Sequence, residues 1–327
     1  KKFIAEKGLF WQKDGEDGME ISIGGHGFRV TINSYMAAEA ATLSKIAHWK
    51  NDNQAQALET EACRIKENMF KYLWDPKAEF LKVLSVEKNA SLKDVRELHG
   101  YTPWAFDLAS ADYAVAWKFL MNTRHFFAPY GPTTAEQCHP QFKVAYEGHE
   151  CQWNGPSWPY ATSMTLVGLA NLLNNQTQSF VDSITLFSIY ARSLYKKDAN
   201  GILTPWIDEN LNPFTGDWIS RTMLSTRHQK PEERGKDYNH SLFCDLVING
   251  LIGIRPSEEE ELDVNPLIPE GYWDYFCLDN LTYRGKTICV LYDKTGDKYK
   301  RGAGLSIFIN GTKTATSPTL TKISCKL

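Results

Sequence analysis

The stretch EDGMEISIGGHGFRVTINSYMAAEA, Glu16–Ala40, changes from an acidic, glycine-rich loop into an alanine-rich helix. Thr31 or Asn33 suits the cap position of that helix, and the glycines suit the turns of the loop before it. By itself the stretch predicts a polar loop that enters a helix containing Met36 and Ile46. It also places several carboxylates directly beside a helix start.

Helical periodicity dominates the first three quarters of the chain. Apolar residues recur at spacings of three and four from Asn53 to Trp74, which is typical of one face of an amphipathic helix. Comparable patterns predict further helices over 105–121, 158–173, 180–194 and 240–252. The loops between them are long and rich in Pro, Gly, Trp and His, and such loops in a compact helical protein are usually functional. We therefore expect the functional site in these loops.

The pattern changes after Pro256. An acidic connector, SEEEELDV, leads into the β-branched segments KTICVLYD, GLSIFING and TLTKISCKL. Turn signals such as Asn310-Gly311 separate these segments, which is typical of hairpins. The chain is therefore predicted to hold a helical domain over 1–255 and a small antiparallel β-domain over 256–327.

Composition excludes several classes of protein. Lys and Arg (36) nearly balance Asp and Glu (39), so a nucleic-acid partner is not expected, and no apolar run is long enough for a membrane partner. The seven cysteines form no CxxC pair, which argues against a zinc site and predicts mostly buried thiols. No metal or cofactor is expected. The aromatic content of 13% suits a protein that stacks sugar rings on flat side chains, although large helical cores also use aromatics.

Helical pairs joined by alternating long and short loops, followed by a β-sheet tail, suggest an (α/α)6 toroid in which loops at one end build the site. Within these loops, QWNGPSWPYATSM (152–164) resembles the signature YWRGPxW, and IDENLNPFTG (207–216) resembles ENYNPxTG. Both belong to inverting glycosidases of glycoside hydrolase family 63 and the mannosylglycerate-hydrolase-like group. The opening stretch also resembles that clan, in which an SGxD segment carries the general acid before a helix that starts like SYMY. The resemblance implies about half to two-thirds of a toroid ring, mainly α, with the C-terminal β-domain.

The resemblance implies an acid and a base for glycoside hydrolysis. Glu20 takes the place of the acid and Glu209 the place of the base. Inverting enzymes hold two such carboxyl groups about 6.5–9.5 Å apart, which leaves room for a water molecule. Many relatives carry Asp where this chain has Glu20, so Asp17, three residues earlier, remains an alternative acid.

Further residues in the same loops suit sugar binding by stacking or by hydrogen bonds to hydroxyl groups. The stacking candidates are Trp104, Trp153 and Trp158. The polar candidates are Asp17, Arg29, His99, Glu150, Gln152, Asn154 and His240. Each tryptophan and histidine has an alternative role in core packing.

The expected substrate is an α-linked glycoside or oligosaccharide. Two rival classes remain: a non-catalytic carbohydrate-binding or scaffold protein, and a different toroid enzyme such as an α-L-rhamnosidase or an uronyl hydrolase. A partial ring would expose apolar helix faces, so the expected partner is either the missing N-terminal half or a second copy of the chain. Asn-x-Ser/Thr sites at Asn89, Asn175, Asn239, Asn280 and Asn310 are compatible with a secreted or periplasmic location.

Overall fold

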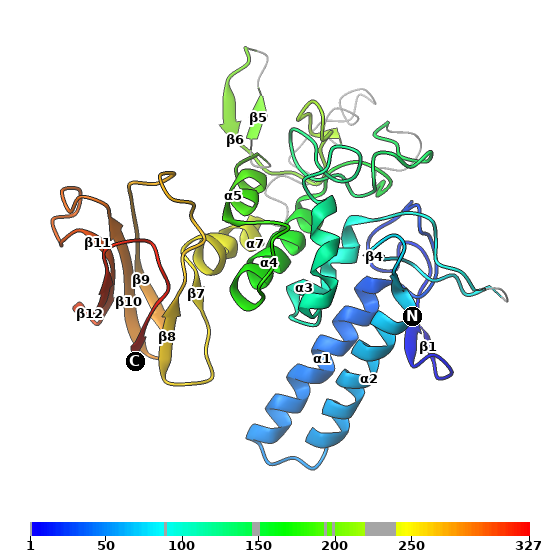
Figure 1. Ribbon diagram of the computed structural model, residues 1–327, viewed down its shortest axis with the longest axis horizontal. Coiled ribbons are helices and arrows are strands. Elements are labelled where there is room, and N and C mark those ends of the chain that lie inside the picture. The colour runs from blue at the N-terminus through cyan, green and yellow to red at the C-terminus, as the bar shows by residue number, and fades with distance from the viewer. Residues whose placement is uncertain (1, 88–89, 146–150, 193–194, 198–199, 220–239) are drawn as a thin grey trace, which may run out of the picture. The chain divides into compact units, whose positions relative to one another are not determined.

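The computed structural model describes residues 2–87, 90–145, 151–192, 195–197, 200–219 and 240–327 (Figure 1). The chain divides into two compact units. The first contains Lys1–Val181 and Arg192–Asn239, and the second contains Asp182–Ala191 and His240–Leu327. Each unit is described in turn.

The first unit is mainly helical, and its longest helices are α1 (Val30–Trp49) and α2 (Ala55–Leu73). These two helices lie side by side as a hairpin (Figure 1). The helix predicted over 53–74 is confirmed, and the apolar stripe packs inward, with Ile65, Met69 and Leu73 almost completely buried. Burying one such side chain contributes about 1.5–3 kcal/mol.

Helix α4 (Pro159–Asn175) packs closely on the short helix α3 (Thr102–Ala105). A Cβ added at Gly168 would lie 3.0 Å from the Cβ of Trp104, so any larger residue there would have to shift the two helices by a few tenths of an ångström. Asn171 Nδ2 donates a hydrogen bond of 3.0 Å to the Trp104 carbonyl oxygen. The helix predicted over 158–173 is thus confirmed as α4, which packs on α3.

The helix predicted over 105–121 is wrong. Asp107 adopts a left-handed conformation (φ 54°), and the Leu108 amide donates to the Pro103 carbonyl oxygen at 2.9 Å, which closes a turn and ends α3. The chain continues as the 3-10 helix η2 (Ala111–Phe119). The other short elements of this unit are β1 (Lys2–Ile4), β2 (Leu9–Trp11), β3 (Trp74–Asp75), β4 (Phe80–Leu81), η1 (Leu98–Tyr101), β5 (Tyr195–Lys197) and β6 (Leu203–Pro205).

The second unit combines short helical segments with two antiparallel sheets. Its helical segments are most of α5 (Ser183–Arg192), α7 (His240–Asp245) and the π-helical η3 (Leu246–Leu251). The strands are β7 (Ile254–Arg255), β8 (Glu261–Val264), β9 (Tyr275–Tyr283), β10 (Lys286–Asp293), β11 (Gly304–Ile309), β12 (Thr312–Ser317) and β13 (Ile323–Lys326). They form a four-stranded sheet in the order β12-β11-β10-β9 and a three-stranded sheet in the order β13-β8-β7. The predicted antiparallel strands of the tail are present.

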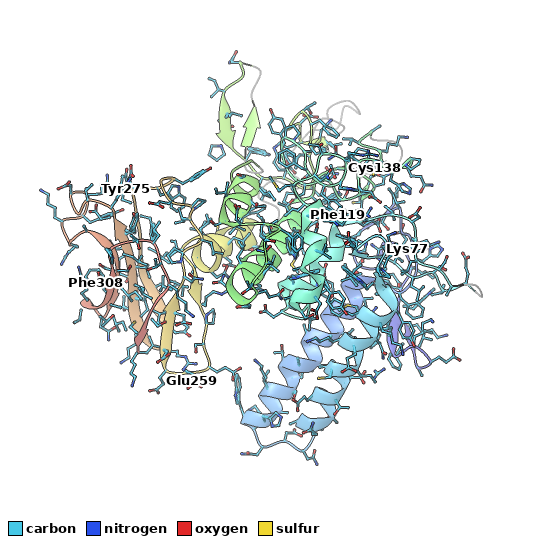
Figure 2. All side chains as sticks on the ribbon, viewed as in Figure 1. Lys77, Phe119, Cys138, Glu259, Tyr275 and Phe308 are labelled. Atoms are coloured by element: carbon cyan, nitrogen blue, oxygen red, sulfur yellow. The ribbon has the colours of Figure 1, made fainter. Side chains whose placement is uncertain are left out.

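The four-stranded sheet has one buried face. Val290 on β10 lies opposite Ile307 on β11, and both side chains are fully buried. Cys289 and Phe308, which also lie opposite each other, alternate with this pair and occupy the other face (Phe308 is labelled in Figure 2). Period-two alternation of apolar residues, visible in the sequence, therefore identifies the core face of this sheet.

The prediction of mostly buried thiols is wrong. Four cysteines are exposed and three are half-buried: Cys63, Cys138, Cys244 and Cys277 in the first group, Cys151, Cys289 and Cys325 in the second. Cys138 is labelled in Figure 2. Among the described residues, no helix combines the length and the apolar character needed to cross a bilayer.

Candidate active site

Arg29, at the start of α1, holds the acidic loop that precedes the helix. Its side chain is fully buried, and Nη1 donates to Ser22 Oγ at 2.7 Å and to the Gly25 carbonyl oxygen at 2.8 Å. The same atom pairs with Asp14 Oδ1 at 3.2 Å. Arg29 was predicted to bind sugar hydroxyl groups. In the structure its guanidinium group holds the loop that carries Glu20.

Asp17 is part of the same network. Its Oδ2 accepts a hydrogen bond of 2.6 Å from Thr31 Oγ1 and lies 3.0 Å from Arg29 Nε, while Oδ1 accepts from the Met19 amide at 3.3 Å. Only 2% of the side chain is exposed. Both carboxylate oxygens of Asp17 are thus engaged within the loop.

Glu20 differs from Asp17 in its surroundings. Its main-chain carbonyl accepts a hydrogen bond of 3.1 Å from the Trp153 amide, which anchors it to a second loop. Its Oε2 is buried and has no hydrogen-bond partner among the described residues. A buried polar atom without a partner is uncommon in folded proteins and marks a place where water or a ligand group belongs.

Trp153 and Trp158 form a stacked pair in that second loop. Their ring centroids lie 4.4 Å apart at an interplanar angle of 13°, and the residues are 5% and 2% exposed. Trp158 Nε1 donates to the Gln152 carbonyl oxygen at 2.9 Å. Each indole therefore packs one ring face on the other, and Trp153 also lines the cavity described below.

Asn154 follows Trp153 in the loop. Its carbonyl oxygen accepts a hydrogen bond of 3.0 Å from the Lys143 amide. The side-chain Oδ1 is buried and lacks a hydrogen-bond partner within the described part of the chain. Asn154 thus offers an acceptor in the same loop as the tryptophan pair.

The segment of Glu209 pairs with this tryptophan loop. Ser157 and Leu211 exchange two main-chain hydrogen bonds of 3.0 and 2.9 Å, as in an antiparallel bridge. The Glu209 amide donates to Asp208 Oδ1 at 2.9 Å, and Asp208 Oδ2 accepts from Trp206 Nε1 at 3.4 Å. Asp208 is 1% exposed, so a buried carboxylate fixes the backbone at Glu209.

Glu97 and His99 form a buried pair beside the Glu20 loop. Glu97 Oε2 lies 3.1 Å from His99 Nε2, and Oε1 accepts a hydrogen bond of 3.2 Å from the Gly24 amide. Burial raises the pKa of Glu97, but the hydrogen bond and charge of His99, the charge of Arg29 and the Gly24 amide outweigh it, so the pKa lies below its usual value.

A small cavity of about 10 Å³ lies beside the Glu97–His99 pair and Trp153. It is lined by Met19, Ser22, Glu97, Leu98, His99, Thr134, Trp153 and Ala161. The structure thus brings together the predicted residues His99 and Trp153 and the segment around Glu20. Glu97 was not predicted as a site residue, although it lies two residues before His99 in an aromatic loop, and that position is visible in the sequence.

The remaining predicted residues lie elsewhere or outside the described structure. Trp104 is 1% exposed and packs edge-on against Trp117 at 5.6 Å between centroids, so its indole belongs to the aromatic core. Glu150 lies outside the described residues. His240 begins α7 in the second unit, and its side chain lies outside the described structure.

Comparison with known proteins agrees with the motifs. Residues 254–315 match the C-terminal domain of glycosyl hydrolase family 65. A solved structure titled "Sialidase" is 38% identical, with a TM-score of 0.87, over 97% of this chain and 29% of its own length. The GH63 mannosylglycerate hydrolase from Thermus thermophilus in complex with glucose is 15% identical, with a TM-score of 0.47, over 68% of this chain and 48% of its own. The chain spans less than half of either protein. Residues 1–241 match the mannosylglycerate hydrolase MGH1-like glycoside hydrolase domain, and the chain belongs to that family.

Proposed function

We propose that this chain carries the catalytic site of an inverting glycoside hydrolase for α-linked glycosides or oligosaccharides, with Glu20 as general acid and Glu209 as general base. One observation carries the proposal: the loop of Trp153 is hydrogen-bonded both to the carbonyl of Glu20 and, through Ser157 and Leu211, to the segment of Glu209. Two carboxylates that are 189 positions apart in sequence thus depend on one loop for their placement.

The contacts of the two candidate acids favour Glu20 over Asp17. A general acid must bring a protonated oxygen within hydrogen-bond reach of the leaving-group oxygen. Both oxygens of Asp17 already contact Arg29, Thr31 or the Met19 amide, whereas Glu20 Oε2 has no hydrogen-bond partner among the described residues. This contrast supports Glu20 as the acid and Asp17 as the residue that holds its loop.

The proposed reaction follows the inverting scheme. Glu20 donates its proton to the glycosidic oxygen as the bond to the anomeric carbon breaks, and Glu209 removes a proton from the water that attacks the opposite face. The Asp208 carboxylate, bonded to the Glu209 amide, fixes the backbone of the base. Trp153 and Asn154 are proposed to contact the sugar from the loop between the two carboxylates.

The finer architecture belongs to the same proposal. Residues 1–255 would form the catalytic part, a partial (α/α)6 toroid, and residues 256–327 the β-domain. The helix pairs α1 with α2 and α3 with α4 support this arrangement. His99, Gln152 and Trp158 complete the proposed site, with Trp158 supporting Trp153 as its stacked partner and His99 paired with Glu97.

Two measurements test the proposal: the stereochemistry of hydrolysis, and the dependence of its rate on each carboxylate. A panel of aryl α-glycosides, including α-glucosides, α-mannosides and α-L-rhamnosides, identifies a substrate, and proton NMR during turnover then follows the anomer first released. We expect the inverted anomer. Glu209→Gln should lose activity on every substrate, whereas Glu20→Gln should retain it on glycosyl fluorides or nitrophenyl glycosides, whose leaving groups need little protonation.

Glu39→Gln serves as the matched control, because Glu39 is an exposed carboxylate on α1 and should be dispensable. Release of the retained anomer would overturn the inverting mechanism. Sugar binding without turnover on any substrate would identify a carbohydrate-binding protein instead, and activity confined to rhamnosides would identify an α-L-rhamnosidase.

A further inference from the structure

We propose that Cys277 and Cys289 form a reversible disulfide that joins β9 to β10 in the second unit. The two Sγ atoms lie 3.8 Å apart, in direct contact. A disulfide bond is about 2.05 Å long, so the sulfurs must approach by a little less than one bond length. The site is independent of the proposed hydrolytic residues, all of which lie in other segments.

The strand register explains how the thiols meet. Cys277 lies opposite Leu291, and Cys289 lies two residues before Leu291, so both thiols project from the same face of the sheet. Pairing along β10 shifts register between Ile288 and Val290, where β9 contains Asn280 at a φ of 64°. Cys289 therefore sits at a bulge in the ladder between β10 and β9, and a bulge locally disrupts the ladder that would otherwise resist a small shift.

The pair is open to a small oxidant. Cys277 is exposed and Cys289 is half-buried. Both line a groove of about 350 Å³ on this face of the sheet, together with Asp279, Thr287, Leu291, Tyr299, Arg301, Phe308 and Gly311. The groove contains the guanidinium group of Arg301 and the carboxylate of Asp279, which suit the carboxylates and the ammonium groups of a disulfide of the glutathione type.

The chemistry is two successive thiol–disulfide exchanges. The Cys277 thiolate attacks one sulfur of oxidised glutathione, forms a mixed disulfide and releases one glutathione thiolate. The Cys289 thiolate then attacks the Cys277 sulfur and releases the second glutathione. The two protein thiols lose two electrons and two protons in total, and oxidised glutathione gains them to become two reduced molecules.

The surroundings of the two thiols set the order of these steps. Burial, with the nearby Cys277 thiol and the Asp279 carboxylate, raises the pKa of Cys289 to about 12. Cys289 is therefore a poor first nucleophile, because the thiolate is the reactive form. The exposed Cys277 is the entry point, and Cys289 is the resolving thiol, whose step should accelerate as the pH rises.

Peptide mapping of the full chain tests the proposal. The reduced protein is equilibrated with a graded series of oxidised and reduced glutathione, quenched with acid, alkylated and digested. We expect these two thiols to become protected together, in a peptide pair that joins residues 277 and 289 and separates on reduction. Oxidation should also raise the midpoint of thermal unfolding, because the cross-link constrains the unfolded chain.

Three variants make the test specific. Cys277→Ser and Cys289→Ser should each abolish the cross-linked peptide, and Cys289→Ser should stop at the mixed disulfide on Cys277. Cys63→Ser, which alters an exposed thiol on α2, should leave the cross-link unchanged. Peptide mapping of the unaltered chain decides the question by itself, because it does not require any variant to fold. The proposal would be overturned if both thiols stayed freely alkylated in fully oxidised buffer, or if a mixed disulfide formed and never resolved.

Discussion

The main-chain amide of Trp153 donates a hydrogen bond of 3.1 Å to the carbonyl oxygen of Glu20. The loop that makes this bond also pairs with Leu211, two residues after Glu209. The relative position of the two proposed catalytic carboxylates thus depends on main-chain contacts of a third segment. Changes to the backbone of that segment should affect activity even where no catalytic side chain is altered.

Gly155 provides a test of this dependence. An added Cβ would lie 2.2 Å from the Lys143 carbonyl oxygen, so Gly155→Ala must displace this loop or the Lys143 segment that packs on it, and we expect the loop to move. A displacement of about 1 Å at a catalytic group can cost on the order of 10²-fold in rate, and we expect a loss of kcat/KM of that size. Gly250→Ala is the control, because its new Cβ would have no neighbour closer than 3.5 Å. Full activity in Gly155→Ala would argue against positioning by this loop.

The stacked tryptophan pair should contribute strongly to stability. Trp158 is 2% exposed and stacks on Trp153 at 4.4 Å, so Trp158→Ala removes a large buried side chain. We expect a loss of about 3–5 kcal/mol in the free energy of unfolding, measured by chemical denaturation. Trp49→Ala alters an indole that is 70% exposed and should change stability by less than about 0.5 kcal/mol. Equal effects in the two variants would contradict the packing role.

Much of the fold follows from local pattern. The sequence predicts helices α2 and α4 because apolar residues recur at helical spacing over many turns. The helix predicted over 105–121 fails because a left-handed residue, Asp107, ends α3, and periodicity does not report such a turn. The burial of the thiols was predicted wrongly because frequencies of burial describe cysteines in general and not the particular positions of these seven.

The candidate site is less visible in the sequence than the fold. Glu20 and Glu209 were identified through motifs, yet the bonds that join their segments run through Ser157 and the Trp153 amide, which no spacing predicts. Glu97 was missed because its partners include the Gly24 amide, 73 residues away. Long-range main-chain contacts of this kind exist only once the chain has folded.

Because of the Glu97–His99 pair, the free energy of unfolding should decrease as the pH falls into the acid range. The folded pKa of Glu97 is lowered, so its contribution is complete above the unfolded value of about 4.3 and is lost as the pH falls through the folded value. Glu97→Gln should lose about 1–3 kcal/mol at neutral pH, because hydrogen bonds to a charged group are replaced by neutral ones.

Urea denaturation of both proteins at a series of pH values measures the difference. The gap between the unaltered chain and Glu97→Gln should be constant from pH 7 to about 5 and shrink at lower pH. Glu39→Gln, on an exposed position of α1, should follow the unaltered chain throughout. A gap that stays constant into strong acid would show that Glu97 acts through packing rather than charge.

His125 should produce a second pH dependence at higher pH. Burial lowers its pKa, and the charges of Arg96 and Arg124 act in the same direction, while the hydrogen bond from Nδ1 to Glu136 at 2.9 Å opposes them. The unfolded chain takes up a proton near pH 6.5, whereas the folded chain resists it until lower pH. The protein should therefore lose stability as the pH falls below about 6.5, and His125→Gln should flatten that part of the profile. His48→Gln, at an exposed position on α1, should retain the slope, and a slope that survives in His125→Gln would assign the dependence to another group.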